Sequence, residues 1–140
     1  ATALVALIVF VPAYDVAAEA GVQVNYDNVK TNEDRVKFLG QFGYNVSGEP
    51  VESVEVTLPS EFDRVFSGYN ELQKAQGLDL AKYKGKTVTR YTYEVDGYPG
   101  HEGEKIYANL IVRKNRIIAG DICSAEPSGF IHGFEMNGEE

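Results

Sequence analysis

The sequence predicts an α+β domain of two layers, in which two main helices pack on one face of an antiparallel sheet. Three observations lead to this prediction. Two segments carry apolar residues at helical spacing, a series of segments with strand-like alternation follows, and a tight turn joins the last two of these. Helices that accompany an antiparallel sheet must bury their apolar sides against it, and this requirement gives the two layers.

Length and composition exclude several classes of protein. The 140 residues suit one domain, and nine Tyr and seven Phe can fill its core. The formal net charge of −8 argues against binding to nucleic acid, which needs clustered Lys and Arg. A single cysteine, Cys123, excludes an internal disulfide and argues against a thiolate metal site. We therefore expect no cofactor, no metal and no nucleic-acid partner.

Residues 1–20 are predicted to be a targeting segment outside the fold. Residues 3–13 read ALVALIVFVPA, which has the length of a signal-peptide hydrophobic region, and small residues follow at Ala18 and Ala20. The run is shorter than the roughly 20 apolar residues that span a bilayer, so it can also be the end of a membrane anchor. A buried N-terminal strand is the third interpretation. We expect export, with membrane contact only through an uncleaved anchor.

Residues 21–30 are predicted to be a polar linker, residues 31–134 the folded domain and residues 135–140 an acidic tail. Thr31 and Asp34 form a capping box at the start of the first helix, and Gly43 ends it. Its apolar side chains share one broad face: Val36, Phe38, Leu39 and Phe42. Short strands are expected at residues 44–46 and 54–58.

The second helix is expected from Ser60, its N-cap, to residue 76, with Asp63 closing a capping box and Gly77 ending the helix. Five apolar or aromatic residues form a continuous stripe along it: Phe62, Val65, Phe66, Tyr69 and Leu72. This stripe is predicted to make the main hydrophobic contact with the sheet, so that Phe66→Ala costs about 3–5 kcal/mol.

Three strands are expected after the second helix, over residues 87–95, 106–112 and 117–123. Lys114 and Asn115 form the tight turn of the last hairpin, because Asn tolerates a positive φ. Residues 128–134 lie outside the regular strands. We interpret them as a strap in which Phe130 and Phe134 fill the sheet edge and a backbone partner satisfies His132. The alternative is a site centred on His132.

Two groups of residues are candidates for catalysis or metal binding. His101, Glu102 and Glu104 lie beside glycines between two strands, which is typical of a solvated hairpin loop, and they lack the spacing of a metal site. His132 with Asp121 or Cys123 is a conceivable nucleophile set. Cys123 lies in an apolar strand, however, where a thiol is expected to be buried and unreactive. No catalytic residue is assigned.

The only basic cluster of the sequence is the group Lys82, Lys84, Lys86 and Arg90, with tyrosines interleaved. These residues can form a surface for anionic polymers or headgroups, or the tyrosines can belong to the core, which strand propensity favours. The candidate binding residues are therefore Lys84, Arg90, Tyr91, Tyr93 and His132.

Several segments resemble the bacterial family of domains of unknown function numbered 4830. The segments are YNELQKAQGLDL at 69–80, YKGK at 83–86, RYTY at 90–93, NLIV at 109–112, GD at 120–121 and GFIHG at 129–133. The resemblance spans about residues 31–134. It implies an extracytoplasmic domain behind an N-terminal signal or anchor, and it assigns no activity to any residue.

The expected function is binding or interaction outside the cytoplasm, without catalysis. Export, the lack of a catalytic motif and the expected compact fold support this interpretation, and the expected partner is a cell-envelope protein or polymer. The alternative is a small hydrolase-like enzyme that uses His132 with Asp121 or Cys123. The two differ in geometry, because a catalytic set must converge in an open cleft within hydrogen-bond reach.

Overall fold

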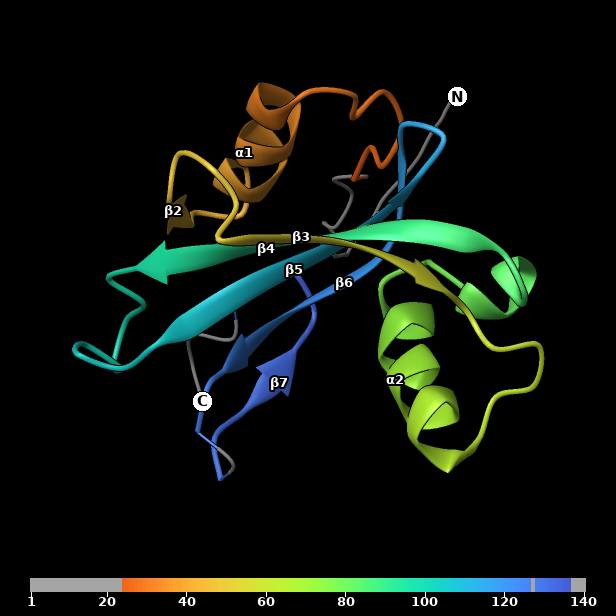
Figure 1. Cartoon of the computed structure of the whole chain (residues 1–140). Coiled ribbons are helices and arrows are strands. Elements are labelled where there is room, and N and C mark those ends of the chain that lie inside the picture. Colours follow the sequence, from red (N-terminus) through yellow and green to blue (C-terminus); the bar gives the residue numbers. More distant parts are fainter. Residues whose placement is uncertain (1–23, 127, 137–140) are drawn as a thin grey trace, which may run out of the picture.

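A computed structural model describes residues 24–126 and 128–136. It confirms the α+β fold class, with two α-helices and a six-stranded antiparallel sheet (Figure 1). The predicted signal peptide or anchor at residues 1–20 lies outside the described residues, as do residues 137–140 of the predicted acidic tail.

Three long strands form the centre of the sheet, and short strands flank them. The order across the sheet is β2-β4-β5-β6-β7, and β3 also pairs with β4, on the same side as β2. In the β5–β6 hairpin, Lys114 and Asn115 have φ of 51° and 62°, as the predicted tight turn requires. The strands are β2 (Asn45–Val46), β3 (Glu52–Thr57), β4 (Thr87–Asp96), β5 (Ile106–Arg113), β6 (Arg116–Ser124) and β7 (Ile131–His132).

The helix α1 (Asn32–Gly40) begins as predicted. Thr31 is its N-cap, and both hydrogen bonds of the capping box with Asp34 are present. Phe38 and Leu39 are buried in the core. The helix ends at Gly40 with Gln41 as its C-cap, earlier than the predicted end at Gly43, and Gly43 lies in the turn that follows, with φ of 98°, a conformation that favours glycine. Local sequence signals therefore define this helix.

The helix α2 (Arg64–Ala75) begins later than predicted, because Asp63 and not Ser60 is its N-cap. The predicted apolar stripe is only partly correct. Phe62, Phe66 and Tyr69 are half-buried against the sheet, but Val65 is 78% exposed. The fully buried residues of α2 are instead polar, Asn70 and Gln73. After α2 the chain forms a short 3₁₀ helix (Leu80–Tyr83).

The two helices cover opposite faces of the sheet, which corrects the prediction that they share one face (Figure 1). Paired residues of neighbouring strands lie on the same face, so Tyr93, Ala108 and Ile122 share the face that α1 covers. The side chains Val88, Ile111 and Ala119 point to the other face, where the aromatic residues of α2 pack. We call this second face the open face, because α2 covers only part of it.

Both ends of the described chain pack on the domain. Residues 24–30, for which we predicted a linker, instead belong to the folded unit: Val29 is buried and its N–H donates to the carbonyl of Asn115. The C-terminal strap is as predicted in its packing, with Phe134 buried among the rings of Phe38 and Phe42. It differs in one respect, since Ile131–His132 form the strand β7.

Candidate functional site

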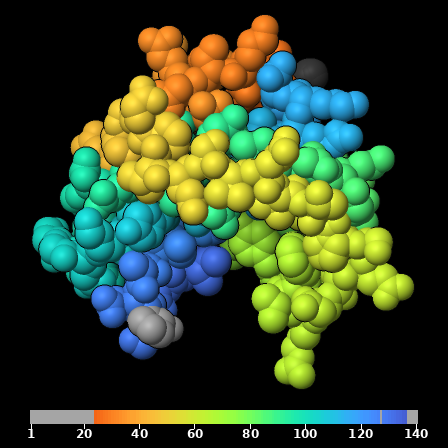
Figure 2. Space-filling model, in the orientation of Figure 1, coloured from red at the N-terminus to blue at the C-terminus, as the bar shows by residue number. Residues whose placement is uncertain are grey.

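The molecule is hollowed on the side of the sheet away from α1. Figure 2 shows this hollow between α2 and the strands near the C-terminus. Part of it is a pocket of about 320 Å³ under α2, and a second depression of about 400 Å³ continues along β4 and β5. Arg90 and Asn109 line both, so the two depressions form one continuous surface, the open face.

The pocket under α2 has mainly apolar walls. Two sets of side chains form them: Val65 and Phe66 from the start of α2, and Val56, Leu58, Val88 and Ile111 from the strands and the residue after β3. The alternation of β3, in which Val54 and Val56 alternate with Ser53 and Glu55, places valines on this face. Apolar walls around a few polar groups are typical of a small-molecule site.

The floor of the open face is a chain of hydrogen-bonded polar side chains. Asp121 lies in its centre and is only 4% exposed. The Tyr69 hydroxyl donates to Asp121 Oδ1 at 2.7 Å, and Asn109 Nδ2 donates to Asp121 Oδ2 at 3.1 Å. The Thr92 hydroxyl donates in turn to Asn109 Oδ1 at 2.7 Å. The register places Thr92, Asn109 and Asp121 side by side on three neighbouring strands.

Burial changes the acidity of this floor. It raises the pKa of the Asp121 carboxyl above its ordinary value, although the hydrogen bonds from Tyr69 and Asn109 oppose this rise. Burial, with the adjacent Asp121, also raises the pKa of the Tyr69 hydroxyl well above its usual range. The Tyr69 hydroxyl and the Asp121 carboxyl are hydrogen-bonded to each other. They therefore stabilise the floor of the open face more than they attract a ligand.

Cys123 lies beside this network and is half-buried, whereas we predicted a buried thiol. Its sulfur accepts a hydrogen bond from Asn109 Nδ2 at 3.6 Å. Burial, followed by the nearby Asp121, raises the pKa of the thiol to about 11. The thiolate is therefore scarce at neutral pH, which supports the predicted low reactivity of this thiol.

The exposed apolar side chains border the open face. In the part of the chain that the structure describes, the exposed large hydrophobic residues are Val51 (54%), Val65 (78%) and Ile131 (54%). Val65 lines the pocket under α2, and Val51 lines the second depression. Ile131 pairs with Cys123, so its side chain lies on the same face. Apolar groups therefore surround a polar floor.

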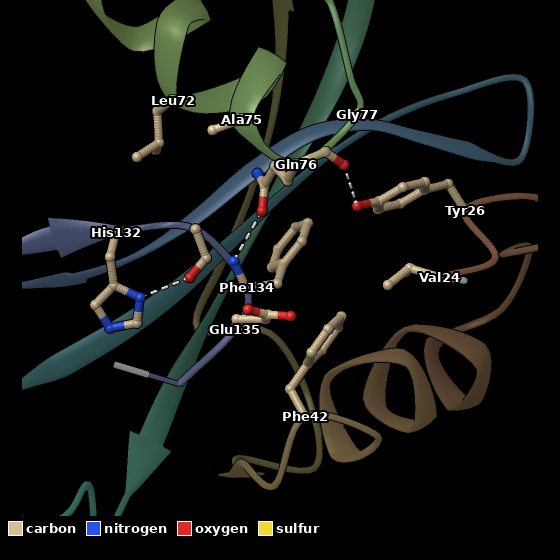
Figure 3. Close-up of a pocket in the computed structure, with 11 residues that line it drawn as sticks. Val24, Tyr26, Phe42, Leu72, Ala75, Gln76, Gly77, His132, Phe134 and Glu135 are labelled. Carbon is tan, nitrogen blue, oxygen red and sulfur yellow. Dashed lines mark hydrogen bonds between the residues drawn. The ribbon is translucent and has the colours of Figure 1, made fainter. Parts of the chain in front are cut away.

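A separate pocket of about 590 Å³ lies on the other side of α2, between this helix and the strap of residues 128–134 (Figure 3). Its polar groups already hold the chain together. Gln76 Oε1 accepts from the N–H of Phe134, the Gln76 carbonyl accepts from the Tyr26 hydroxyl, and His132 Nδ1 donates to the carbonyl of Gly133. This pocket is therefore a joint between the strap, α2 and the N-terminal segment.

The predicted basic and aromatic binding residues do not lie together in the structure. Tyr93 is buried under α1, where it accepts a hydrogen bond from Arg35 Nε and donates one to Asn32 Oδ1. Tyr91 is on that same face, with the Arg35 guanidinium 3.7 Å from its ring centre. Lys84 lies over the ring of Phe62. Of the five candidates, only Arg90 lines the open face.

His132 does not converge with Asp121 or Cys123. His132 pairs with Ile122, and neighbouring residues of a strand point to opposite faces, so His132 is on the α1 side of the sheet. Both of its ring nitrogens are engaged: Nδ1 donates to the Gly133 carbonyl, so that Nε2 accepts from the Tyr98 hydroxyl at 2.7 Å. The predicted backbone partner of His132 is thereby confirmed.

Asn109 and Tyr69 are the site residues that sequence reasoning missed. The available signal was the position of polar residues, since Asn109 interrupts the apolar run of its strand and aligns with Asp121 once the hairpin register is known. We assigned Tyr69 to the apolar stripe of α2, and helical spacing does not show which residue its hydroxyl contacts.

The remaining candidate groups give no metal site. His101 Nδ1 lies 3.1 Å from both carboxylate oxygens of Glu104 in the predicted hairpin loop. No group of three or more His, Cys, Asp or Glu side chains is placed to hold a metal ion within residues 24–126 and 128–136. In those same ranges, the helices are too short or too polar to cross a membrane.

Comparison with known proteins gives one match. Residues 38–122, more than half of the chain, match the family model described as Domain of unknown function (DUF4830). No curated protein and no solved structure matches the chain.

Proposed function

This chain belongs to the DUF4830 family of domains of unknown function, and we propose that it is an extracytoplasmic binding domain that holds its ligand on the open face without performing chemistry. The apolar run at residues 3–13 supports the location, because its length matches a signal-peptide hydrophobic region. The ligand or partner belongs to the cell envelope in this proposal.

One observation carries the proposal: the exposed large apolar side chains of the described chain all border the open face. Exposed apolar groups that gather on one surface mark interaction sites more often than isolated ones do. The polar floor between them is internally hydrogen-bonded, so a ligand can cover it without leaving Asp121 or Asn109 unpaired.

Two features argue for binding rather than catalysis. The thiol of Cys123 is held protonated by its raised pKa. The histidine that could serve as its base, His132, lies across the sheet. A nucleophile and its base must be within hydrogen-bond reach, and here the two side chains point to opposite faces of the sheet.

A neutral apolar dye tests the proposal. N-phenyl-1-naphthylamine fluoresces when it leaves water, so a fluorescence titration reports its affinity. We expect the protein to bind the dye and Val65→Asp to weaken binding by about tenfold, because a charge is placed on the rim of the pocket. Leu72→Asp is the matched control, since Leu72 is on the same helix but lines the other pocket.

The expected result requires that Leu72→Asp bind the dye like the unchanged protein, with circular dichroism showing both variants folded. Equal weakening by both substitutions, or none by Val65→Asp, would reject the open face as the binding surface.

A further inference from the structure

We infer that the ligand of the open face is a small amphipathic anion: an apolar group that lies against Phe66 and the strand residues beneath it, and a carboxylate that binds Arg90. This inference rests on the proposed function and adds the chemical class of the ligand. Arg90, which lines both depressions, lies where the apolar pocket meets the polar part of the face.

Arg90 is the basic side chain of this surface. Among the described residues that line the two depressions, no other Lys or Arg occurs. Its side chain is 38% exposed and makes one hydrogen bond within the described chain, from Nη2 to Glu52 Oε1 at 2.7 Å. Its Nε is buried and has no acceptor there. A ligand cannot reach this buried Nε, but the two Nη groups carry four N–H donors, and the hydrogen bond to Glu52 uses only one of them.

Glu52 is a weak competitor for Arg90. Its side chain is 54% exposed at the edge of the sheet. Exposed ion pairs of this kind contribute only about 0–1 kcal/mol, because water screens the attraction. A ligand carboxylate that is partly shielded by apolar walls can form shorter, charge-assisted hydrogen bonds with the same guanidinium, in the two-point geometry that arginine favours.

The other acidic group of the pocket does not favour a cationic ligand. Asp121 is nearly inaccessible, and its two oxygens accept hydrogen bonds from Tyr69 and Asn109. Burial also raises its pKa, which disfavours the charged form. In the pocket under α2, Arg90 is thus the charged group that a ligand reaches directly, and it selects an anion, whereas Glu52 lines only the second depression.

The size of the pocket limits the apolar part of the ligand. A volume of about 320 Å³ is at the lower end of small-molecule sites, which are about 300–1,000 Å³. The wall residues Val56, Phe66 and Ile111 suit an apolar group of up to about three rings or a short branched chain. A small acid therefore fits better than a polymer chain.

Two dyes that differ in one anionic group test the inference. The probes are N-phenyl-1-naphthylamine and its sulfonate, 8-anilinonaphthalene-1-sulfonate, whose sulfonate stands in for the carboxylate. We expect the anionic dye to bind about tenfold more tightly than the neutral one, and Arg90→Gln to reduce this ratio of the two affinities to about one.

Two further variants sharpen the result. Glu52→Gln should tighten the anionic dye, because it frees Arg90 from its partner. Arg116→Gln is the matched control, since Arg116 also lies on a strand, is 41% exposed and pairs with an acid, Asp27, away from the pocket. This variant should bind both dyes like the unchanged protein.

The outcomes separate this inference from the proposed function. If both dyes bind equally, or if Arg90→Gln preserves the preference for the anion, the ligand class is wrong although the open face still binds. If neither dye responds to Val65→Asp, the proposed function fails, and this inference fails with it.

Discussion

Among the single side chains of the open face, Asp121 is the buried acid. It is an acid that the fold places in the middle of a sheet at 4% exposure, where water cannot stabilise its charge. The Tyr69 hydroxyl and the Asn109 amide replace part of that water. The remaining cost of burial raises the pKa of the carboxyl above its ordinary 3.8, so the folded protein binds this proton more tightly than the unfolded chain.

The protonation of Asp121 predicts a pH dependence of stability. The contribution of its raised pKa is fully present below the ordinary pKa and is lost as pH rises through the raised value. We expect the free energy of unfolding of the unchanged protein, minus that of Asp121→Asn, to fall as pH increases from about 4 to about 7. Urea denaturation across this range measures the difference.

Asp34 is a control of opposite sign for this measurement. Backbone hydrogen bonds at the start of α1 lower the pKa of its carboxyl, so its contribution is lost as pH falls. The free energy of unfolding of the unchanged protein, minus that of Asp34→Asn, should therefore decrease toward acid pH. A difference for Asp121→Asn that does not vary with pH would contradict the raised pKa.

Among the helices, α2 is held by polar side chains where the sequence suggested only an apolar stripe. Gln73, fully buried, lies against the edge of β6: its Nε2 donates to the carbonyl of Gly120 at 3.0 Å, and its Oε1 accepts from the Gly120 N–H at 2.9 Å. Its amide thus pairs with both backbone groups of one residue, as a neighbouring strand would. This contact fixes the position of α2 beside the open face.

Removal of the Gln73 amide is expected to destabilise the domain. Gln73→Leu leaves the Gly120 N–H without its acceptor, while the Gly120 carbonyl keeps a hydrogen bond from Gln76 Nε2. We expect a loss of about 1–3 kcal/mol, the cost of a buried unsatisfied donor. Gln41 provides the control, since it is exposed and its Nε2 donates one hydrogen bond, to the Phe38 carbonyl, so Gln41→Leu should cost less, about 0.5–1 kcal/mol. Equal effects in urea denaturation would refute this role.

For the domain as a unit, the two ends of the described chain meet on the α1 side of the sheet. The ring of Phe134 lies 5.0 Å from that of Phe38 and 6.4 Å from that of Tyr26. Gly120 makes room for it, because a Cβ at that position would be 2.2 Å from Phe134 Cζ. The strap, the N-terminal segment and the sheet therefore form one core.

This shared core predicts where the chain can be shortened. A chain that begins at Gly21 should unfold cooperatively, because the helices, the sheet and residues 24–30 all remain. A chain that begins at Thr31 loses buried Val29 and the hydrogen bond of Tyr26 to Gln76, so it should be less stable by at least about 1.5–3 kcal/mol. Thermal and urea unfolding compare the two. Equal stability would mean that residues 24–30 are a linker after all.

The features that depend on near neighbours in the chain could be predicted from the sequence. The capping box of Thr31 and Asp34, the alternation of the strands and the tight turn at Lys114 and Asn115 are all present. Each depends on interactions among residues a few positions apart, so the local pattern contains the information. The assignment of residues 120–121 to a strand also placed Asp121 beside an apolar core, although not its partners.

The positions that depend on distant contacts were decided by the tertiary structure. Helical spacing shows that a helix has an apolar side but not which face of the sheet it covers, and α1 and α2 cover opposite faces. For the same reason the sequence did not show the hydrogen bonds of Gln73 with Gly120 and of Tyr69 with Asp121, which join residues 47 and 52 positions apart. It also allowed His132 and Cys123 to be grouped, although the pleat of the sheet directs them to opposite sides. Local pattern determines the elements, whereas their mutual packing creates the open face.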